Sequence, residues 1–100
     1  MSTSDDVWNA LNAVIDQQTF LFFVQKLIGD REDEVRNEKT QPSSPYGPGA
    51  NGWENYTIEQ FLEAAVAWAE DSDFGLSQGR PVDNLWRKFA EFLYSGKVYE

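Results

Sequence analysis

The chain of 100 residues contains no cysteine and no histidine. Without thiols, disulfides and cysteine-ligated metal sites are excluded, and without imidazole the commonest acid–base catalyst and zinc ligand is missing. Neither cysteine–histidine nor serine–histidine–aspartate nucleophilic sites can be built from the remaining residue types. We therefore predict a protein that is not an enzyme and that has no catalytic residues, no metal and no cofactor.

Long hydrophobic runs are also missing. The longest, FLFFV at residues 20–24, is far shorter than the roughly 20 residues that a membrane-spanning helix needs. The first residues, MSTSDDVWN, are acidic and polar where a secretory signal would carry positive charge. We expect a soluble, cytoplasmic protein without a membrane partner.

Positive charge is scarce. Eight Lys and Arg stand against seventeen Asp and Glu, which gives a formal net charge of −9. Such a balance argues against nucleic acid as a partner, because phosphates require clustered cations. No Lys or Arg occurs between Lys39 and Arg80, a stretch that holds six acids: Glu54, Glu59, Glu63, Glu70, Asp71 and Asp73. We expect a negative surface there, which serves solubility alone or docks a basic protein partner.

Apolar and aromatic side chains are plentiful, at 41% and 15% of residues. Apolar residues recur every third or fourth position in four segments, which is typical of amphipathic helices. We predict an all-α fold, a small bundle or an irregular array of about four helices, in a single domain spanning residues 1–100. A strand through residues 13–24 is the alternative, although sustained alternation of apolar and polar residues is missing.

Two helices are predicted before residue 41. The first ends near residue 13, and Asp16 or Thr19 caps the second. The second helix begins with an apolar stripe made by Phe20, Phe23, Val24, Leu27 and Ile28. Beyond this stripe, residues 30–40 are polar almost all round, so we predict a solvated helical extension there.

A loop and two further helices follow. Residues 41–52, QPSSPYGPGANG, hold three Pro and three Gly, which predicts a flexible surface loop. Thr57 and Gln60 have the spacing of a capping box at the start of the third helix. The apolar stripe of this helix, which we expect to face the core, comprises Ile58, Phe61, Leu62, Ala65, Val66, Trp68 and Ala69. Asp83 is the predicted cap of the fourth helix, and Gly96 is predicted to end it in a left-handed conformation.

The four tryptophans divide into two kinds. Three fall at stripe positions and are expected in the core: Trp8, Trp68 and Trp86. Trp53 lies at the junction between the loop and the third helix. Either it packs on Phe61 as a hydrophobic staple, or it forms a partly exposed patch with Tyr56 that anchors a partner.

These observations give a set of candidate partner-binding residues rather than a catalytic site. Glu59 and Glu63 are four positions apart and share a helix face, but the apolar stripe places both toward solvent, which disfavours a paired-carboxylate hydrolase or a cation site. The candidate partner-binding residues are Trp53, Glu54, Tyr56, Glu59, Glu63, Glu70, Asp71 and Asp73.

The order of several blocks resembles a known family. The blocks are WEN-x-TIEQFLEAAVAW, then WRKFAEFL, then a terminal GKVYE. The chain is similar in them to a family of small, acidic bacterial proteins classed as a domain of unknown function. The matching residues are Trp53, Asn55, Phe61, Leu62, Glu63, Ala64, Trp68, Trp86, Phe89, Ala90, Leu93, Tyr99 and Glu100. The resemblance covers residues 19–100, leaves the first helix unmatched, and implies a free-standing cytoplasmic domain without an assigned activity.

The leading hypothesis for function is a non-enzymatic protein-interaction module with an acidic face. One concrete version is an immunity-type inhibitor that neutralises a basic toxin, because carboxylates mimic phosphate and favour fast, salt-sensitive association. The alternatives are a self-associating helical structural protein and a carboxylate-based enzyme with a cleft of convergent acids.

Overall fold

The computed structural model describes residues 3–43, 49–80 and 83–99. Within these ranges the chain forms helices and no strands, which confirms the predicted all-α fold. The elements are α1 (Thr3–Asn12), α2 (Gln17–Thr40), α3 (Ile58–Ser72), the short 3-10 helix η1 (Leu76–Gln78) and α4 (Leu85–Val98). None of the described helices has an apolar stretch long enough to cross a membrane.

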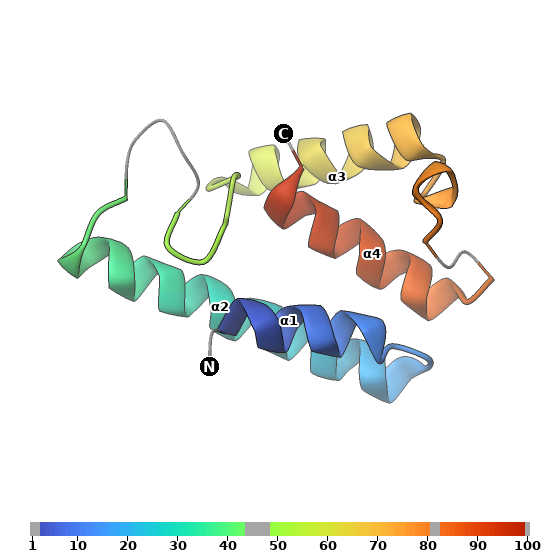
Figure 1. The fold of residues 1–100 in the computed structure, drawn as a ribbon, viewed down its shortest axis with the longest axis horizontal. Helices are drawn as coiled ribbons and strands as arrows, with labels where there is room; N and C mark the ends of the chain where they lie inside the picture. The colour runs from blue at the N-terminus through green and yellow to red at the C-terminus, as the bar shows by residue number, and fades with distance from the viewer. Residues whose placement is uncertain (1–2, 44–48, 81–82, 100) are drawn as a thin grey trace.

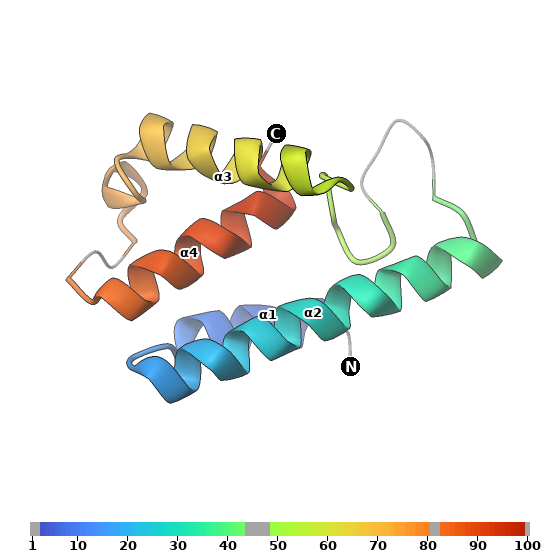
Figure 2. The same cartoon turned by 180° about the vertical axis from the view of Figure 1, so that it is seen from behind.

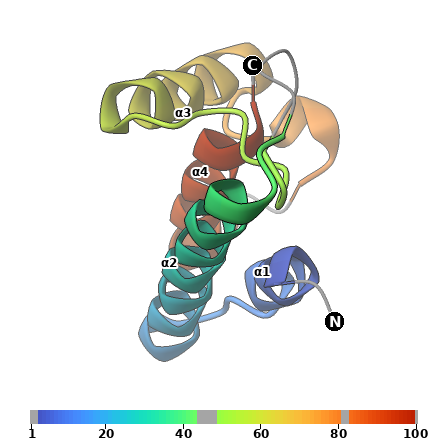
Figure 3. The same cartoon turned by 90° about the vertical axis from the view of Figure 1, so that its left-hand side faces the viewer.

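The helices form two antiparallel hairpins, α1 with α2 and α3 with α4 (Figure 1). The two hairpins meet through α4. α1 packs along the first half of α2, and α3 packs along α4. α4 also contacts α1 and α2, so it lies between α3 and the first hairpin, as the reverse view confirms (Figure 2). Seen from one end, α3 crosses above α4, and α1 lies beside α2 (Figure 3).

Side-chain caps fix where three helices begin. Asp16 accepts the backbone N–H of Thr19 at 2.9 Å, and Thr57 accepts that of Gln60 at 3.0 Å, each within a complete capping box. The predicted starts of α2 and α3 are therefore confirmed. The predicted cap Asp83 is wrong, because the cap of α4 is the next residue, Asn84.

Asn84 can make two hydrogen bonds at the start of α4 because its side-chain amide has both an acceptor and a donor, whereas the carboxylate of Asp83 has acceptors alone. Its side-chain oxygen accepts the backbone N–H of Arg87 at 3.1 Å, while its NH₂ group donates to the carbonyl of Ile15 at 2.9 Å. A carboxylate could make the first bond but could not donate the second. The cap therefore also ties α4 to the connection between α1 and α2.

The core gathers between α1, α2 and α4. Its buried apolar residues are Val7, Ala10, Leu11, Val14, Phe23, Leu27, Trp53 and Ala90. Trp68 is buried as expected, but the prediction for Trp8 and Trp86 is wrong because both rings are substantially exposed. Trp8 packs against Tyr94 and Trp86 against Phe20, so each ring covers the edge of the core.

The polar second half of α2 departs most from its prediction. Asp30 and Glu34 are completely buried although the segment was expected to be solvated. The reason is that residues 49–55 return across this half of the helix and donate hydrogen bonds to its carboxylates. The residues of the predicted flexible loop at 44–48 lie outside the described ranges. The described residues on either side are held by Glu38, which accepts the backbone N–H groups of Ser43 at 2.7 Å and Ala50 at 3.0 Å.

Gly96 does not end α4, contrary to prediction. The helix continues to Val98, and the side chain of Asn55 donates to the carbonyls of Gly96 at 2.9 Å and Tyr99 at 3.0 Å. Gly96 is instead a point of close approach between helices. A Cβ atom there would lie 2.8 Å from the carbonyl oxygen of Phe61 in α3.

Candidate functional site

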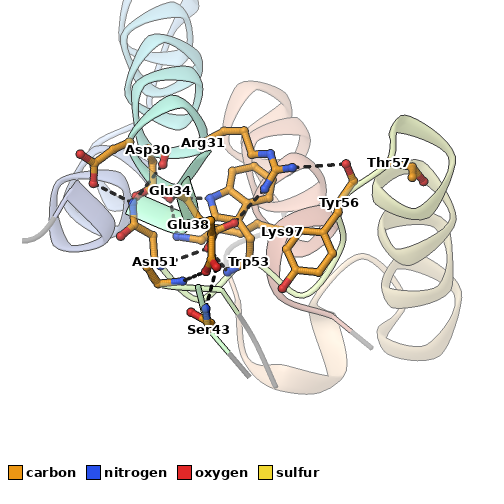
Figure 4. A network of polar contacts seen from close by, with 12 residues as sticks. Asp30, Arg31, Glu34, Glu38, Ser43, Asn51, Trp53, Tyr56, Thr57 and Lys97 are labelled. Carbon is orange, nitrogen blue, oxygen red and sulfur yellow. Dashed lines mark hydrogen bonds and ion pairs between the residues drawn. The ribbon is translucent and has the colours of Figure 1, made fainter. Parts of the chain in front are cut away.

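A buried ion pair joins the middle of α2 to the end of α4. Lys97 Nζ lies 2.6 Å from Asp30 Oδ2, and both side chains are almost fully buried. The same carboxylate oxygen accepts the indole N–H of Trp53 at 2.9 Å (Figure 4). Burying two charges is expensive unless they are paired and hydrogen-bonded. Asp30 therefore fixes the positions of both Lys97 and Trp53.

Two further carboxylates continue along the same face of α2. Glu34 and Glu38 follow Asp30 at intervals of four residues, which places them one above the other. Glu34 accepts the backbone N–H groups of Asn51 at 3.1 Å and Trp53 at 3.2 Å, and it pairs with the Arg31 guanidinium at 2.8 Å. The three acids thus hold the returning chain against α2.

The carboxylates of this half of α2 accept hydrogen bonds from backbone and side-chain donors. Hydrogen bonds from the side chain and the backbone of Ser43 lower the pKa of Glu38 despite an opposing effect of desolvation. Asp33 is also held in its charged form, because hydrogen bonds led by the Asn51 side chain lower its pKa. Groups that are bonded in this way hold the returning segment in place.

Trp53 belongs to this network rather than to the surface. It is only 4% exposed and stacks on Phe61 with ring centroids 6.0 Å apart. The staple interpretation is therefore confirmed and the exposed-patch interpretation is wrong for Trp53, because its N–H is bonded to buried Asp30. Tyr56 does lie at the surface, and the guanidinium of Arg31 lies 5.4 Å from the ring centroids of both Trp53 and Tyr56.

An apolar cavity of about 270 Å³ opens beside this stack. Its walls come from α2, from the stretch before α3 and from α3 itself, and they comprise Leu27, Ile28, Arg31, Glu32, Trp53 and Phe61. Within the described part of the chain, α2 and α3 do not pack against each other. The cavity thus lies where the stretch before α3 joins these two helices.

Exposed apolar side chains also occur on the three helices α2, α3 and α4. On α3, Ile58, Leu62 and Val66 are spaced by four residues and are 76%, 48% and 46% exposed. On α2, Leu21 is seven residues before Ile28 and lies on the same flank. We define the apolar groove as these five residues together with Phe89 of α4, which is also exposed.

The placement of Phe89 follows from the two contacts of α4. Gly96 faces α3 at Phe61, and Lys97 faces α2 at Asp30. Because successive residues turn by about 100° around an α-helix, Phe89 projects about 20° from the direction of Gly96, on the side toward Lys97. It is half exposed, so it borders the groove on the side of α4 that is nearest α3.

The predicted acidic residues occupy different places around this groove. Glu59, Glu63 and Glu70 are exposed on the outer face of α3, beside its apolar row, and Glu32 lines the opposite wall on α2. The other three are not gathered with them. Glu54 is half-buried in the returning segment, Asp71 accepts the hydroxyl of Tyr99 at 2.5 Å on the other flank of α3, and Asp73 follows the end of that helix.

Sequence reasoning missed the groove because it assigned Ile58, Leu62 and Val66 to the core. One signal was present: the apolar stripe of α3 is wider than the face that a single partner helix can cover. The buried pair of Asp30 and Lys97 had no such signal, since neither residue stands at an unusual position in its helix. It depends on a contact between residues 67 positions apart.

Together, the fold and the groove define a small all-α protein of two helical hairpins with an open, acid-edged apolar groove. Residues 16–100 match the model of a family of unknown function, DUF7660, and the chain belongs to that family. The resemblance to a domain of unknown function is thereby confirmed. α1 lies outside the matched range. No curated protein and no solved structure matches the chain.

Proposed function

We propose that this protein is a non-enzymatic interaction module whose apolar groove binds an amphipathic helix with Lys and Arg beside its apolar stripe. One observation carries the proposal. An apolar cavity opens between α2 and the start of α3, exposed apolar side chains occur on α2, α3 and α4, and carboxylates of α2 and α3 are exposed near them.

The apolar part of the groove suits a helix in length and in chemistry. Ile58 and Val66 are eight residues apart on α3, which corresponds to about 12 Å along the helix axis. Two to three turns of a bound helix cover that distance with anchors at positions i, i+4 and i+7. Full burial of one Leu or Ile side chain contributes roughly 1.5–3 kcal/mol, so three such contacts supply the main part of a micromolar affinity.

The charges at the edges select the partner. Glu59, Glu63 and Glu70 line the α3 side, and Glu32 lies on the α2 side. A helix with flanking cations meets these carboxylates on both sides, which speeds association and makes it sensitive to salt. An acidic helix of the same shape is repelled.

The positions of these charges also bear on the other hypotheses for function. A second copy of this chain carries a net charge of −9, so self-association through the groove sets like-charged edges against each other. An immunity-type role is a special case of our proposal in which a basic toxin presents the helix. A carboxylate-based enzyme is disfavoured because Glu59 and Glu63 stand at an exposed edge rather than in a cavity.

A designed peptide tests the proposal. The probe is a synthetic helix with Leu at positions i, i+4 and i+7 and Lys on both flanks, and its control is a scrambled peptide of equal charge. We expect saturable binding of the first peptide alone, measured by fluorescence anisotropy. Ile28→Ser and Leu62→Ser should each weaken it about tenfold, which is the effect of roughly 1.4 kcal/mol of lost burial.

The matched control lies on the same helix as Ile28. Phe22 is 51% exposed, close to the 54% of Ile28, but it points away from the groove and lies under Lys26. Phe22→Ser should leave the affinity unchanged. Equal binding of the scrambled peptide, or equal weakening by all three substitutions, would show that the groove is not the site.

A further inference from the structure

A second cavity lies on the opposite side of α4 from the apolar groove. Its volume is about 250 Å³, and four aromatic residues line it: Trp8, Trp68 and Tyr94 from three different helices, and Tyr99 after the end of α4. Among the residues of α4 that line this cavity, Glu91 is the nearest in sequence to Phe89, which it follows by two positions. Two positions correspond to about 200° around a helix, so the cavity and the groove are separate surfaces.

The polar wall of this cavity contains an ion pair, Arg80 with Glu91. Arg80 forms a bidentate salt bridge with the buried carboxylate of Glu91, with Nε–Oε1 and Nη2–Oε2 distances of 2.7 Å each. Arg87 adds a second guanidinium at 3.3 Å from Oε2. Asn12 Oδ1 accepts a bond from each arginine at 2.9 Å. Two guanidinium groups therefore neutralise this one carboxylate, although Arg87 does not itself line the cavity.

Two lining residues still have donors to offer. Among the described residues, neither Nη1 of Arg80 nor the hydroxyl of Tyr94 has a protein hydrogen-bond partner. Burial is the main cause that raises the pKa of Tyr94, so its hydroxyl remains protonated at neutral pH. The guanidinium carbon of Arg80 also lies 5.1 Å from the centroid of the Trp8 ring, which places the cation against the aromatic wall.

We propose that this cavity binds a small aromatic carboxylate, with its ring among Trp8, Trp68 and Tyr94 and its anionic group on Arg80. Aromatic walls favour a flat apolar ring, and a guanidinium with a neighbouring hydroxyl favours a carboxylate over a neutral group. The size agrees with this class, because a cavity of about 150 Å³ already holds benzene. The proposal does not depend on what the groove binds.

Benzoate and its neutral analogue benzamide are the probes for the full chain. The readout is the set of four tryptophan indole N–H signals in NMR spectra. Benzoate should shift the signals of Trp8 and Trp68 saturably, while Trp53 and Trp86, which do not line this cavity, serve as internal controls. We expect benzoate to bind about tenfold more tightly than benzamide, since a charge-assisted hydrogen bond exceeds a neutral one by about 1 kcal/mol or more.

Two variants separate the roles of the donors. Tyr94→Phe keeps the ring and should weaken benzoate about fivefold through the loss of one hydrogen bond. Arg80→Gln should abolish the preference for benzoate over benzamide, whereas Arg36→Gln at a remote exposed cation should not. The proposal is overturned if benzoate leaves the Trp8 and Trp68 signals unshifted, if benzamide binds equally well, or if folded Tyr94→Phe binds benzoate as the wild type does.

Discussion

At the scale of single residues, Asp30 connects three segments of the chain that are far apart in the sequence. Its carboxylate is bonded to the ammonium group of Lys97 and to the indole of Trp53, and its backbone carbonyl accepts the side-chain amide of Asn51. These partners come from the returning segment and from the end of α4. One buried charge therefore determines how three distant segments meet.

Removal of the ammonium group of Lys97 should lower the stability of the fold. Lys97→Met leaves Asp30 buried without its counter-charge, so we expect the free energy of unfolding to fall by about 3–5 kcal/mol. The control is Arg36→Met, which breaks an exposed pair with Asp33 and should cost less than about 1 kcal/mol. Urea denaturation followed by circular dichroism measures both. A Lys97→Met protein as stable as the control would contradict the importance of the pair.

Acid should weaken the attachment of the returning segment. The pKa of Glu38 is lowered in the fold from an ordinary value of 4.5, chiefly by hydrogen bonds from Ser43. A depressed pKa contributes stability above the unfolded value, and this contribution is lost as the pH falls through the folded value. The free energy of unfolding should therefore fall below about pH 4.5. Glu38→Gln should flatten that dependence, and Glu63→Gln, at an exposed residue outside the network, should not.

At the scale of elements, α3 shows what an amphipathic pattern can and cannot specify. Its capping box and its buried residues Ala65, Trp68 and Ala69 agree with the sequence prediction. The pattern also contains Ile58 and Leu62, which the structure leaves exposed. Periodicity defines the apolar flank of a helix, but the number of neighbours that cover it depends on tertiary arrangement.

The glycines of α2 and α4 should respond to alanine in opposite ways. At Gly29 a Cβ atom meets nothing within 4 Å, so Gly29→Ala should raise stability by about 0.5–1 kcal/mol through helix propensity. At Gly96 the Cβ atom would lie 2.8 Å from the Phe61 carbonyl oxygen. Gly96→Ala should destabilise by about 1–3 kcal/mol because α3 and α4 must move apart. Thermal unfolding of both variants compares the signs, and equal stabilisation would refute the close approach.

The helices and most of their starts could be predicted from local sequence, because capping and periodicity act within a few residues. The candidate site could be predicted only in part. The exposed acids Glu59, Glu63 and Glu70 were identified correctly as solvent-facing, whereas the burial of Glu34 required the segment 49–55 to fold back across α2. Such long-range contacts leave no periodic signal in the sequence.

At the scale of the whole molecule, the two hairpins differ in how completely they are covered. α1 buries Val7 and Leu11 completely against α2 and α4, although it lies outside the residues that match the family model. No described helix covers the groove between α2 and α3 in the same way. The apolar groove therefore stays exposed between α2 and α3, and carboxylates stand along its edges.

Mapping the bound peptide by NMR tests this account most directly. Amide chemical shifts are recorded for the free protein and for the protein saturated with the basic amphipathic peptide. We predict that the largest changes fall around Ile28, Leu62 and Phe89, while the signals around Trp8 on the far side of α4 stay in place. Changes that are spread evenly over the surface, or that gather around Trp8, would contradict the claim that the apolar groove is the binding surface.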